Sequence, residues 1–189
     1  MRSSLPPESD LKPSASLLLS TLLDLDVTDA LGLPDNTSAA LFALLKGEPH
    51  VRLLTVTREA EAFAIASGLW VGGRSPVIIM QNTGLLESGD ALRGTAVRMG
   101  VPLLCLITYR GYASLHAQQH HPGVIRSRDD LVRPDLDSTA VVLEPTLASW
   151  GIPFFLYGQD GDASRIPEAL AQAQSERRPV ALLITRELR

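Results

Sequence analysis

The chain has 189 residues, enough for one sizeable domain and too few for two ordinary ones. A formal net charge of -4 gives no basic footprint for nucleic acid, and 45% hydrophobic with 20% charged residues describe a soluble globular protein. The apolar run Leu17 to Leu25 is broken by Asp24 and has no signal-peptide character, and no run is long enough to span a membrane, so we expect a cytoplasmic protein.

The first residues are expected to form a loose arm. Residues 1–13 carry prolines and scattered polar residues without periodicity. From Ser14 to Leu25 the leucines recur at helical spacing, and Ser14 after Pro13 is a candidate N-cap. We therefore expect the domain to occupy residues 14–189.

Strands and helices are predicted to alternate along the rest of the chain. The predicted strands are short, continuously apolar runs: Val27–Gly32, Val51–Val56, Pro76–Met80, Pro102–Thr108, Pro153–Leu156 and Pro179–Thr185. The predicted helices that follow the first one are Thr37–Lys46, Glu59–Gly73, Gly89–Arg98, Ser138–Ser149 and Ser164–Glu176. The polar stretch Tyr109 to Asp137 shows no clear period and is expected to be a long loop. This alternation predicts an α/β fold, doubly wound, with six mostly parallel strands and helices on both faces.

The one cysteine, Cys105, excludes an internal disulfide and lies inside an apolar run. We interpret it as a buried strand residue and not as a nucleophile. Ligands of doubly wound sheets bind at the carboxyl ends of the strands. Four segments fall there: 32–36, Glu59, 81–84, and the residues after Thr108. A site is therefore expected at this edge of the sheet, whatever its chemistry.

The stretch Val56 to Gly73 turns from a strand into a helix whose first turn carries Glu59, a position that the helix dipole favours for an acid. The following helix is rich in small residues, so that another backbone could approach it closely: Ala60, Ala62, Ala64, Ala66, Ser67 and Gly68. On spacing alone, a capped and tightly packed crossover helix explains the pattern.

Two motifs resemble the pyrimidine-binding (Pyr) domain of thiamine-diphosphate enzymes, and in particular sulfopyruvate and phosphonopyruvate decarboxylases. They are Arg58-Glu59-Ala60-Glu61-Ala62 with Ala64-Ile65-Ala66-Ser67-Gly68, and Pro76-Val77-Ile78-Ile79-Met80-Gln81-Asn82-Thr83-Gly84. The resemblance implies that the first glutamate of the motif hydrogen-bonds the aminopyrimidine ring of the cofactor. Counting back from Gly68, this residue is Glu59 and not Glu61. The resemblance runs from about Val27 to Thr185 and is weakest between Ser114 and Asp137.

Two turns carry further candidate residues. Taken alone, Gly32-Leu33-Pro34-Asp35-Asn36 is a tight turn followed by a helix cap. It resembles a family turn whose acidic residue faces the active centre, which implies a catalytic Asp35, a cofactor contact at Pro34 and a substrate contact at Asn36. The turn 81–84 is similar to the family's Gln-Asn-Ser-Gly, which implies that Gln81, Asn82 and Thr83 contact the cofactor.

The long loop supplies the remaining candidates. The pair Gln119-His120 resembles a Gln-His pair that reaches the substrate in the look-alike decarboxylases, which implies a catalytic His120 with His121 as a second substrate contact. Tyr109-Arg110-Gly111 resembles the family's Trp-Arg-Gly, and Arg110 could neutralise a sulfonate, phosphonate or carboxylate. A solvated arginine at a strand end is the equally good alternative. The histidines have no carboxylate or cysteine at ligand spacing beside them, so no metal site is expected in this chain.

The resemblance implies thiamine diphosphate and Mg²⁺ as cofactors and a 2-oxo acid as substrate. The Gly-Asp-Gly motif with a downstream Asn, which holds the diphosphate and the metal in this family, does not occur in the chain. We therefore expect an α (Pyr-domain) subunit that needs a β (PP-domain) partner and associates with its own copies. The alternatives are a non-catalytic Pyr-like scaffold and a generic nucleotide-binding domain, the latter weakened by the lack of a Gly-x-Gly-x-x-Gly motif.

Overall fold

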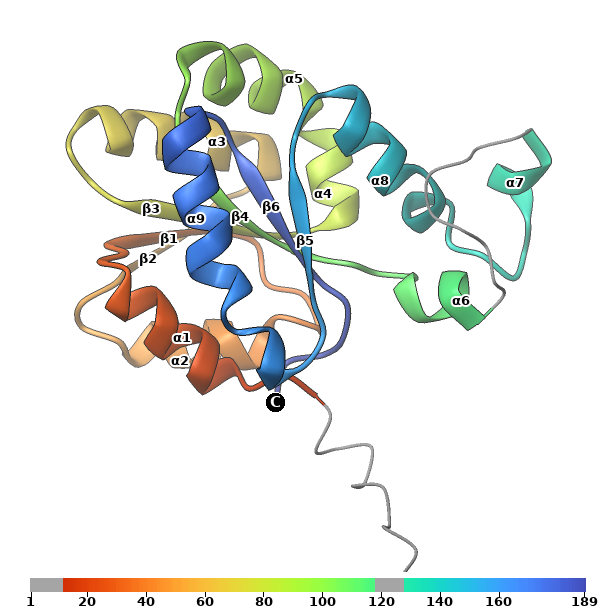
Figure 1. Cartoon of the computed structure of the whole chain (residues 1–189), viewed down its shortest axis with the longest axis horizontal. Coiled ribbons are helices and arrows are strands. Elements are labelled where there is room, and N and C mark those ends of the chain that lie inside the picture. Colours follow the sequence, from red (N-terminus) through yellow and green to blue (C-terminus); the bar gives the residue numbers. More distant parts are fainter. Residues whose placement is uncertain (1–11, 118–127) are drawn as a thin grey trace, which may run out of the picture.

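A computed structural model describes residues 12–117 and 128–189 of the chain (Figure 1). Its sheet has six strands in the order β2-β1-β3-β4-β6-β5, and each neighbouring pair is parallel. The strands are β1 (Asp29–Gly32), β2 (Arg52–Thr55), β3 (Pro76–Gln81), β4 (Leu104–Thr108), β5 (Phe154–Tyr157) and β6 (Val180–Ile184). The predicted α/β class and the six strands are confirmed, and the sheet is parallel throughout.

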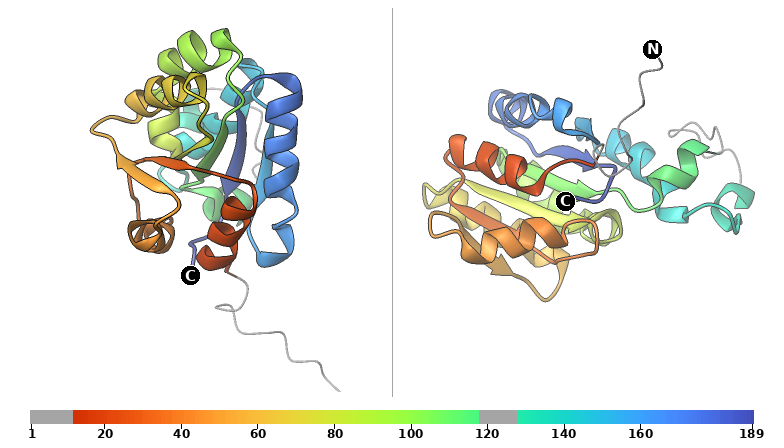
Figure 2. Two further views of the ribbon diagram at one scale, coloured as in Figure 1. Left: turned by 90° about the vertical axis from the view of Figure 1, so that its left-hand side faces the viewer. Right: turned by 90° about the horizontal axis from the view of Figure 1, so that it is seen from below.

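Helices connect these strands and cover both faces of the sheet (Figure 2). Those described are α1 (Ala15–Asp24), α2 (Ala39–Gly47), α3 (Glu59–Val71), α4 (Asn82–Glu87), α5 (Gly89–Ala91) continued by the π-helical η2 (Leu92–Val97), α6 (Tyr112–Ala117), α7 (Arg128–Val132), α8 (Ser138–Ser149), the short η3 (Asp160–Asp162) and α9 (Arg165–Glu176). No helix within the described ranges is long and apolar enough to cross a membrane.

The sheet separates two hydrophobic cores because successive strand residues point to opposite faces. On β3, Ile78 and Met80 pack with α3, α4, η2 and α8, whereas Val77 and Ile79 pack with α1, α2 and α9. Both faces of the central strands are therefore buried, which explains why their sequences are continuously apolar. Cys105 lies in β4 and is buried as predicted, and burial raises the pKa of its thiol to about 12.

Two helix starts follow from local hydrogen bonds. Ser14 caps α1 as predicted, because its Oγ accepts a hydrogen bond from the Leu17 amide at 3.2 Å. The second helix begins at Ala39, later than predicted, because Asp35 first binds the amides of Thr37 and Ser38 at 2.7 and 3.2 Å. These bonds extend the turn after β1 before the helix begins.

The structure corrects two loop predictions. Residues 82–84 were expected in a turn, but they form the first turn of α4, and Asn82 and Gly84 are buried there. The stretch 109–137 was expected to be a loop, but its described part contains α6 and α7, which lie at one side of the sheet (Figure 1). The helices α4, α6 and α7 are each too short to show a helical period. Buried leucines support two of them, Leu85 in α4 and Leu115 in α6.

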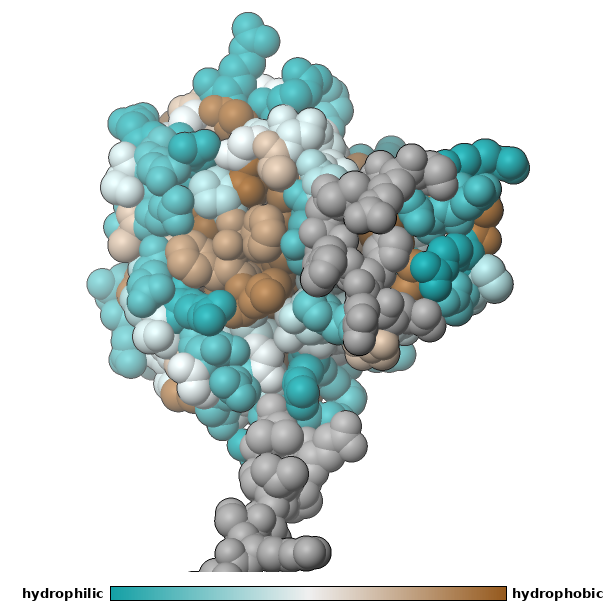
Figure 3. Space-filling model, turned by 45° about the vertical axis from the view of Figure 1, so that its right-hand side comes forward, coloured by the Kyte–Doolittle hydropathy of each residue, from teal (hydrophilic) through white to brown (hydrophobic). Residues whose placement is uncertain are grey.

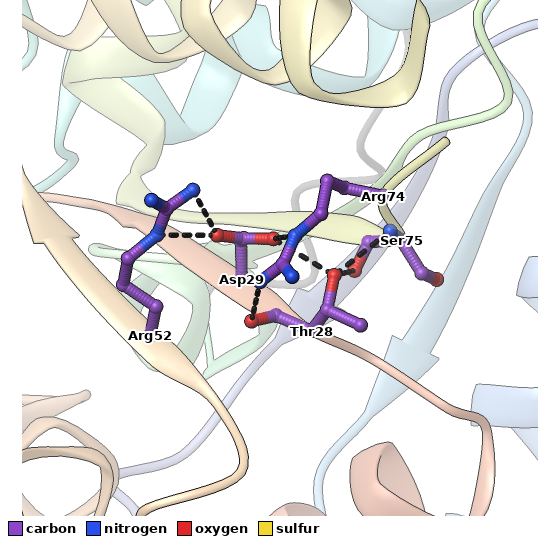
Figure 4. Close-up of polar contacts among 5 residues, drawn as sticks. All are labelled: Thr28, Asp29, Arg52, Arg74 and Ser75. Carbon is purple, nitrogen blue, oxygen red and sulfur yellow. Dashed lines mark hydrogen bonds and ion pairs between the residues drawn. The ribbon is translucent and has the colours of Figure 1, made fainter. Parts of the chain in front are cut away.

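A buried carboxylate joins the amino ends of three strands (Figure 4). Asp29 of β1 has no exposed side-chain surface and pairs with Arg52 of β2 at 2.7 Å and with Arg74, which precedes β3, at 2.8 Å. It also accepts a hydrogen bond from the hydroxyl of Thr28 at 2.8 Å. Burial raises the pKa of Asp29, but its hydrogen bonds with Arg74, Thr28 and Arg52 outweigh burial and hold it below the ordinary value. This cluster fixes the edge of the sheet opposite to the candidate site.

An apolar surface lies at β5, the edge strand at the end of the sheet beyond β6. Phe154, Phe155 and Leu156 of this strand are each partly exposed. Figure 3 shows a patch of hydrophobic surface on this side, surrounded by hydrophilic residues. An unpaired apolar strand edge is a place where another chain can bind.

Candidate active site

The carboxyl ends of the parallel strands bring most of the predicted site residues to one edge of the sheet. Asp35 follows β1, Glu59 follows β2, Gln81 ends β3, and Arg110 follows β4. The predicted histidines, His120 and His121, lie outside the described residues. Asp35, Glu59, Gln81 and Arg110 therefore lie at the carboxyl edge of the sheet, as expected. The contacts of these side chains differ.

Glu59 begins α3 and lies across Gly84 of α4. A Cβ atom added to Gly84 would lie 2.4 Å from Glu59 Cγ and 2.5 Å from its Oε1, so only glycine leaves room for this side chain. Glu59 is half-buried. Within the described ranges its carboxylate makes no hydrogen bond or ion pair, so both oxygens are available as acceptors.

Glu61, the other acid of the motif, is used as a helix cap. Its carboxylate accepts hydrogen bonds from the amide and hydroxyl of Thr57, at 3.0 Å each, and from the amide of Arg58 at 3.4 Å. The amide and hydroxyl of Thr57 and the amide of Arg58 hold the pKa of Glu61 below its ordinary value. Glu61 therefore secures the start of α3, whereas the Glu59 carboxylate has no hydrogen-bond partner among the described residues.

Asp35 has both oxygens engaged within the chain. Its Oδ1 accepts hydrogen bonds from the backbone amides of the following turn. Its Oδ2 accepts hydrogen bonds from the hydroxyls of Ser38 at 3.0 Å and of Thr108 at 2.8 Å. Thr108 is buried at the end of β4. Asp35 thus ties the turn after β1 to β4, while its neighbours Pro34 and Asn36 are exposed. Its predicted catalytic role remains a prediction.

The motif 81–84 is organised by bonds of its own. Asn82 is fully buried. Its side-chain Nδ2 donates a hydrogen bond to the backbone carbonyl of Arg110 at 3.0 Å, and its Oδ1 accepts one from the backbone amide of Thr83 at 3.1 Å. The hydroxyl of Thr83 donates to Gln81 Oε1 at 2.9 Å. Asn82 therefore fixes the backbone after β4, whereas Gln81 and Thr83 remain partly exposed.

Arg110 is paired with a carboxylate of the same chain. Its Nε lies 2.8 Å from Oδ2 of Asp137, whose other oxygen caps α8 through the amide of Thr139 at 3.0 Å. Gly111 permits this approach, because it has φ of +85° and a Cβ atom there would lie 2.6 Å from Asp137 Cβ. The side chain of Arg110 is nevertheless 59% exposed. The Nε of Arg110 is therefore engaged by Asp137, while its other guanidinium N–H groups can still donate hydrogen bonds.

A cavity of about 360 Å³ joins three of the predicted residues, and its size suits a small ligand. Asn36, Gln81 and Arg110 line it together with two residues that the sequence did not single out, Tyr112 and Arg186. Arg186 follows β6, so the rule that ligands bind at the carboxyl ends of strands could have found it. Tyr112 lies on α6, where no helix was expected.

An aromatic row flanks this cavity. The ring of Tyr112 lies between Tyr109, with centroids 5.1 Å apart, and His116, with centroids 4.1 Å apart. The hydroxyl of Tyr109 lies 3.2 Å from Oε1 of Glu144. Burial raises the pKa of Glu144 and outweighs the hydrogen bond from Tyr109, which lowers it. The row thus places an imidazole and a phenol at this edge, with a weakly acidic carboxyl behind them.

Residues 12–117 and 128–189 contain no cluster of three or more His, Cys, Asp or Glu side chains that could hold a metal ion. A half-buried free carboxylate and an amide-lined cavity at one sheet edge are suited to hydrogen-bond a polar organic ligand, with a guanidinium for an anionic group.

Comparison with known proteins gives matches that agree with this arrangement. Residues 14–129 match the family described as thiamine pyrophosphate enzyme, N-terminal TPP binding domain. The chain is 32% identical over 118 residues to phosphonopyruvate decarboxylase of Streptomyces viridochromogenes, covering 62% of this chain and 30% of that protein. It is 29% identical over 90 residues to sulfopyruvate decarboxylase subunit alpha of Methanococcus maripaludis, covering 48% of this chain and 54% of that subunit.

These matches confirm the resemblance seen in the motifs, although the family match begins and ends earlier than the range expected from the sequence. The matched part of the chain corresponds to less than a third of the phosphonopyruvate decarboxylase and to about half of the sulfopyruvate decarboxylase subunit.

Proposed function

The chain belongs to the thiamine pyrophosphate enzyme family through that family's N-terminal TPP binding domain. We propose that it is the Pyr-domain (α) subunit of a two-chain 2-oxo acid decarboxylase. The substrate is sulfopyruvate or phosphonopyruvate, the acids named by the relatives. The observation that carries the proposal is the Glu59 carboxylate, which lies half-buried across Gly84 without a partner among the described residues.

The residues at Glu59 fit the pyrimidine end of the cofactor. Gly84 leaves the room that the glutamate side chain occupies, and Glu61 takes over the capping of α3. The Glu59 carboxylate would share a proton with a ring nitrogen of the aminopyrimidine, and its half-buried position strengthens such a bond. When bound, thiamine diphosphate supplies the electron sink for loss of carbon dioxide from a 2-oxo acid. Gln81 and Thr83, beside Gly84, are the further candidate contacts.

The diphosphate end of the cofactor requires a second chain in this proposal. The family's Gly-Asp-Gly motif with a downstream Asn does not occur here, and 158–162 has neither the order nor the Asn. A PP-domain β subunit would hold Mg²⁺ and the diphosphate. The exposed face of α3 supports an association surface: Ile65 and Val71 are 42% and 66% exposed, and nothing lies within 4 Å of a Cβ atom built on Gly68. The same face is the candidate for contact between copies of this chain.

The alternative function is a non-catalytic Pyr-like module that scaffolds or regulates another protein. The apolar surfaces on α3 and β5 are compatible with it. The Glu59 carboxylate, which has no hydrogen-bond or ion-pair partner among the described residues, favours the enzyme, because a scaffold does not need an acid at this position. Binding between this chain and a PP-domain protein separates the two functions only when it is combined with a test for turnover.

The direct experiment mixes this chain with a candidate PP-domain partner protein, thiamine diphosphate and Mg²⁺. Consumption of sulfopyruvate and phosphonopyruvate is then followed with each chain alone and with both. We expect turnover only with both chains. Tight cofactor binding and turnover by this chain alone would contradict the two-chain proposal, and association without turnover of any 2-oxo acid would favour the scaffold.

A further inference from the structure

The segment after β6 crosses the carboxyl edge of the sheet and is held at both ends. The amide of Thr185 donates to the carbonyl of Tyr157, at the end of β5, at 2.9 Å. The amide of Leu188 donates to the carbonyl of Thr37 at 3.0 Å, and the Leu188 side chain is buried. Arg186 lies between these two attachments. Its backbone is therefore fixed over the edge, between β6 and the turn that carries Asn36.

Arg186 lines three neighbouring cavities at this edge of the sheet. It lines the cavity of about 360 Å³ with Gln81 and Asn36, and also two neighbouring cavities of about 690 and 340 Å³. These three cavities have Tyr112, Thr185 and Arg186 in common. A ligand in any of them would therefore meet the Arg186 side chain.

Within residues 12–117 and 128–189, the charge of Arg186 has no carboxylate partner. The other lysine and arginine side chains that line these cavities each have a carboxylate partner: Lys12 with Glu187 at 2.7 Å, Arg110 with Asp137 at 2.8 Å and Arg165 with Asp162 at 3.7 Å. Among the carboxylates of the described residues, none lies within ion-pair distance of Arg186. Burial and Glu144 raise the pKa of the Tyr112 phenol, and Arg186 acts against them, so its charge is felt inside the cavities.

We propose that Arg186 binds the anionic group at the far end of the 2-oxo acid, a sulfonate or a phosphonate. This inference rests on the proposed function and assigns the anion to a residue other than Arg110. A guanidinium offers paired donors that match the oxygens of such groups. The side-chain amides of Asn36 and Gln81 border the same cavity and add donors around it. Arg110 is less suited, because its Nε is committed to Asp137.

The first test measures binding without turnover. Phosphonoacetate and sulfoacetate are titrated by calorimetry into the full chain, into Arg186→Gln and into Arg178→Gln. Arg178→Gln is the control, because it removes an equal charge from an arginine that precedes β6 and pairs with Glu176. We expect Arg186→Gln to weaken binding by about 10- to 100-fold, the loss typical of a hydrogen-bonded charged pair, and Arg178→Gln to leave it unchanged. Equal affinity in Arg186→Gln, or no binding by the unmodified chain, overturns the proposal.

The second test uses the two-chain enzyme. Arg186→Gln should raise KM for sulfopyruvate or phosphonopyruvate far more than it lowers kcat, and Arg186→Lys should restore part of the affinity. A fall in kcat with KM unchanged would contradict a role in binding the anion. If the unmodified pair of chains turns over no 2-oxo acid, the proposed function fails, while the calorimetric comparison still decides whether Arg186 binds the anion.

Discussion

Substitution of Gly84 by alanine tests whether the position of the Glu59 carboxylate matters for activity. The added Cβ atom would lie 2.4 to 2.6 Å from three atoms of the Glu59 side chain. Carbon and oxygen atoms in contact are normally about 3.5 Å apart, so the carboxylate must move by roughly 1 Å. A misplacement of about 1 Å in a catalytic arrangement costs on the order of 100-fold in rate. We therefore expect decarboxylation by the two-chain enzyme to fall about 100-fold.

Stability should not fall with activity in this variant. Gly84 lies inside α4, where alanine is a better helix former than glycine by about 1 kcal/mol, and the obstructing atoms belong to a movable side chain. The matched control is Gly94→Ala, because a Cβ atom at Gly94 meets nothing within 4 Å. Unfolding by denaturant and cofactor affinity by calorimetry are measured beside the rate. Full activity and unchanged cofactor affinity in Gly84→Ala would refute the role given to Glu59.

Two further predictions concern buried polar groups outside the site. Asp29→Asn should lower the free energy of unfolding by about 2 kcal/mol, because the buried carboxylate binds two arginines. The loss stays moderate because both arginines are half-exposed and can be solvated by water. The control Asp90→Asn, at an exposed ion pair, should change the free energy of unfolding little. The pKa of Asp29 is lowered from 3.8 in the folded chain, so the stabilisation by this carboxylate is complete above about pH 4 and is lost on acidification below it. The difference in unfolding free energy between the unmodified chain and Asp29→Asn should therefore shrink below about pH 4. A difference that stays constant in denaturant titrations would contradict this. Tyr157→Phe should raise the melting temperature, because the buried hydroxyl has no hydrogen-bond partner within the described residues, and a fall in melting temperature would show that the hydroxyl is satisfied.

The fold could be predicted from the sequence because its strands are apolar runs bounded by residues that break regular structure. Pro76 to Met80, for example, is buried on both faces, and no alternation was needed to recognise it. The assignment of Glu59 over Glu61 came from the family motif, and the structure adds the physical difference between the two acids, since only Glu61 caps α3.

Other features depend on contacts between distant parts of the chain. The partner of Arg110 is Asp137, which lies beyond the long polar stretch, and no local pattern links the two residues. The helix that contains Tyr112 is too short to show a period. Arg186 gains its surroundings only when β4, β5 and β6 lie side by side and the following residues bind Thr37. Sequence spacing alone could not predict these three features.

In the proposed function, Glu59 activates the cofactor while Glu61 only supports the start of α3. The most direct measurement compares decarboxylation by the two-chain enzyme containing Glu59→Gln with that containing Glu61→Gln, each beside the unmodified chain. We predict that Glu59→Gln abolishes turnover while the chain stays folded and associated with its partner. Glu61→Gln should retain turnover and lose some resistance to unfolding. Turnover that survives in Glu59→Gln and disappears in Glu61→Gln would show that Glu61, and not Glu59, activates the cofactor.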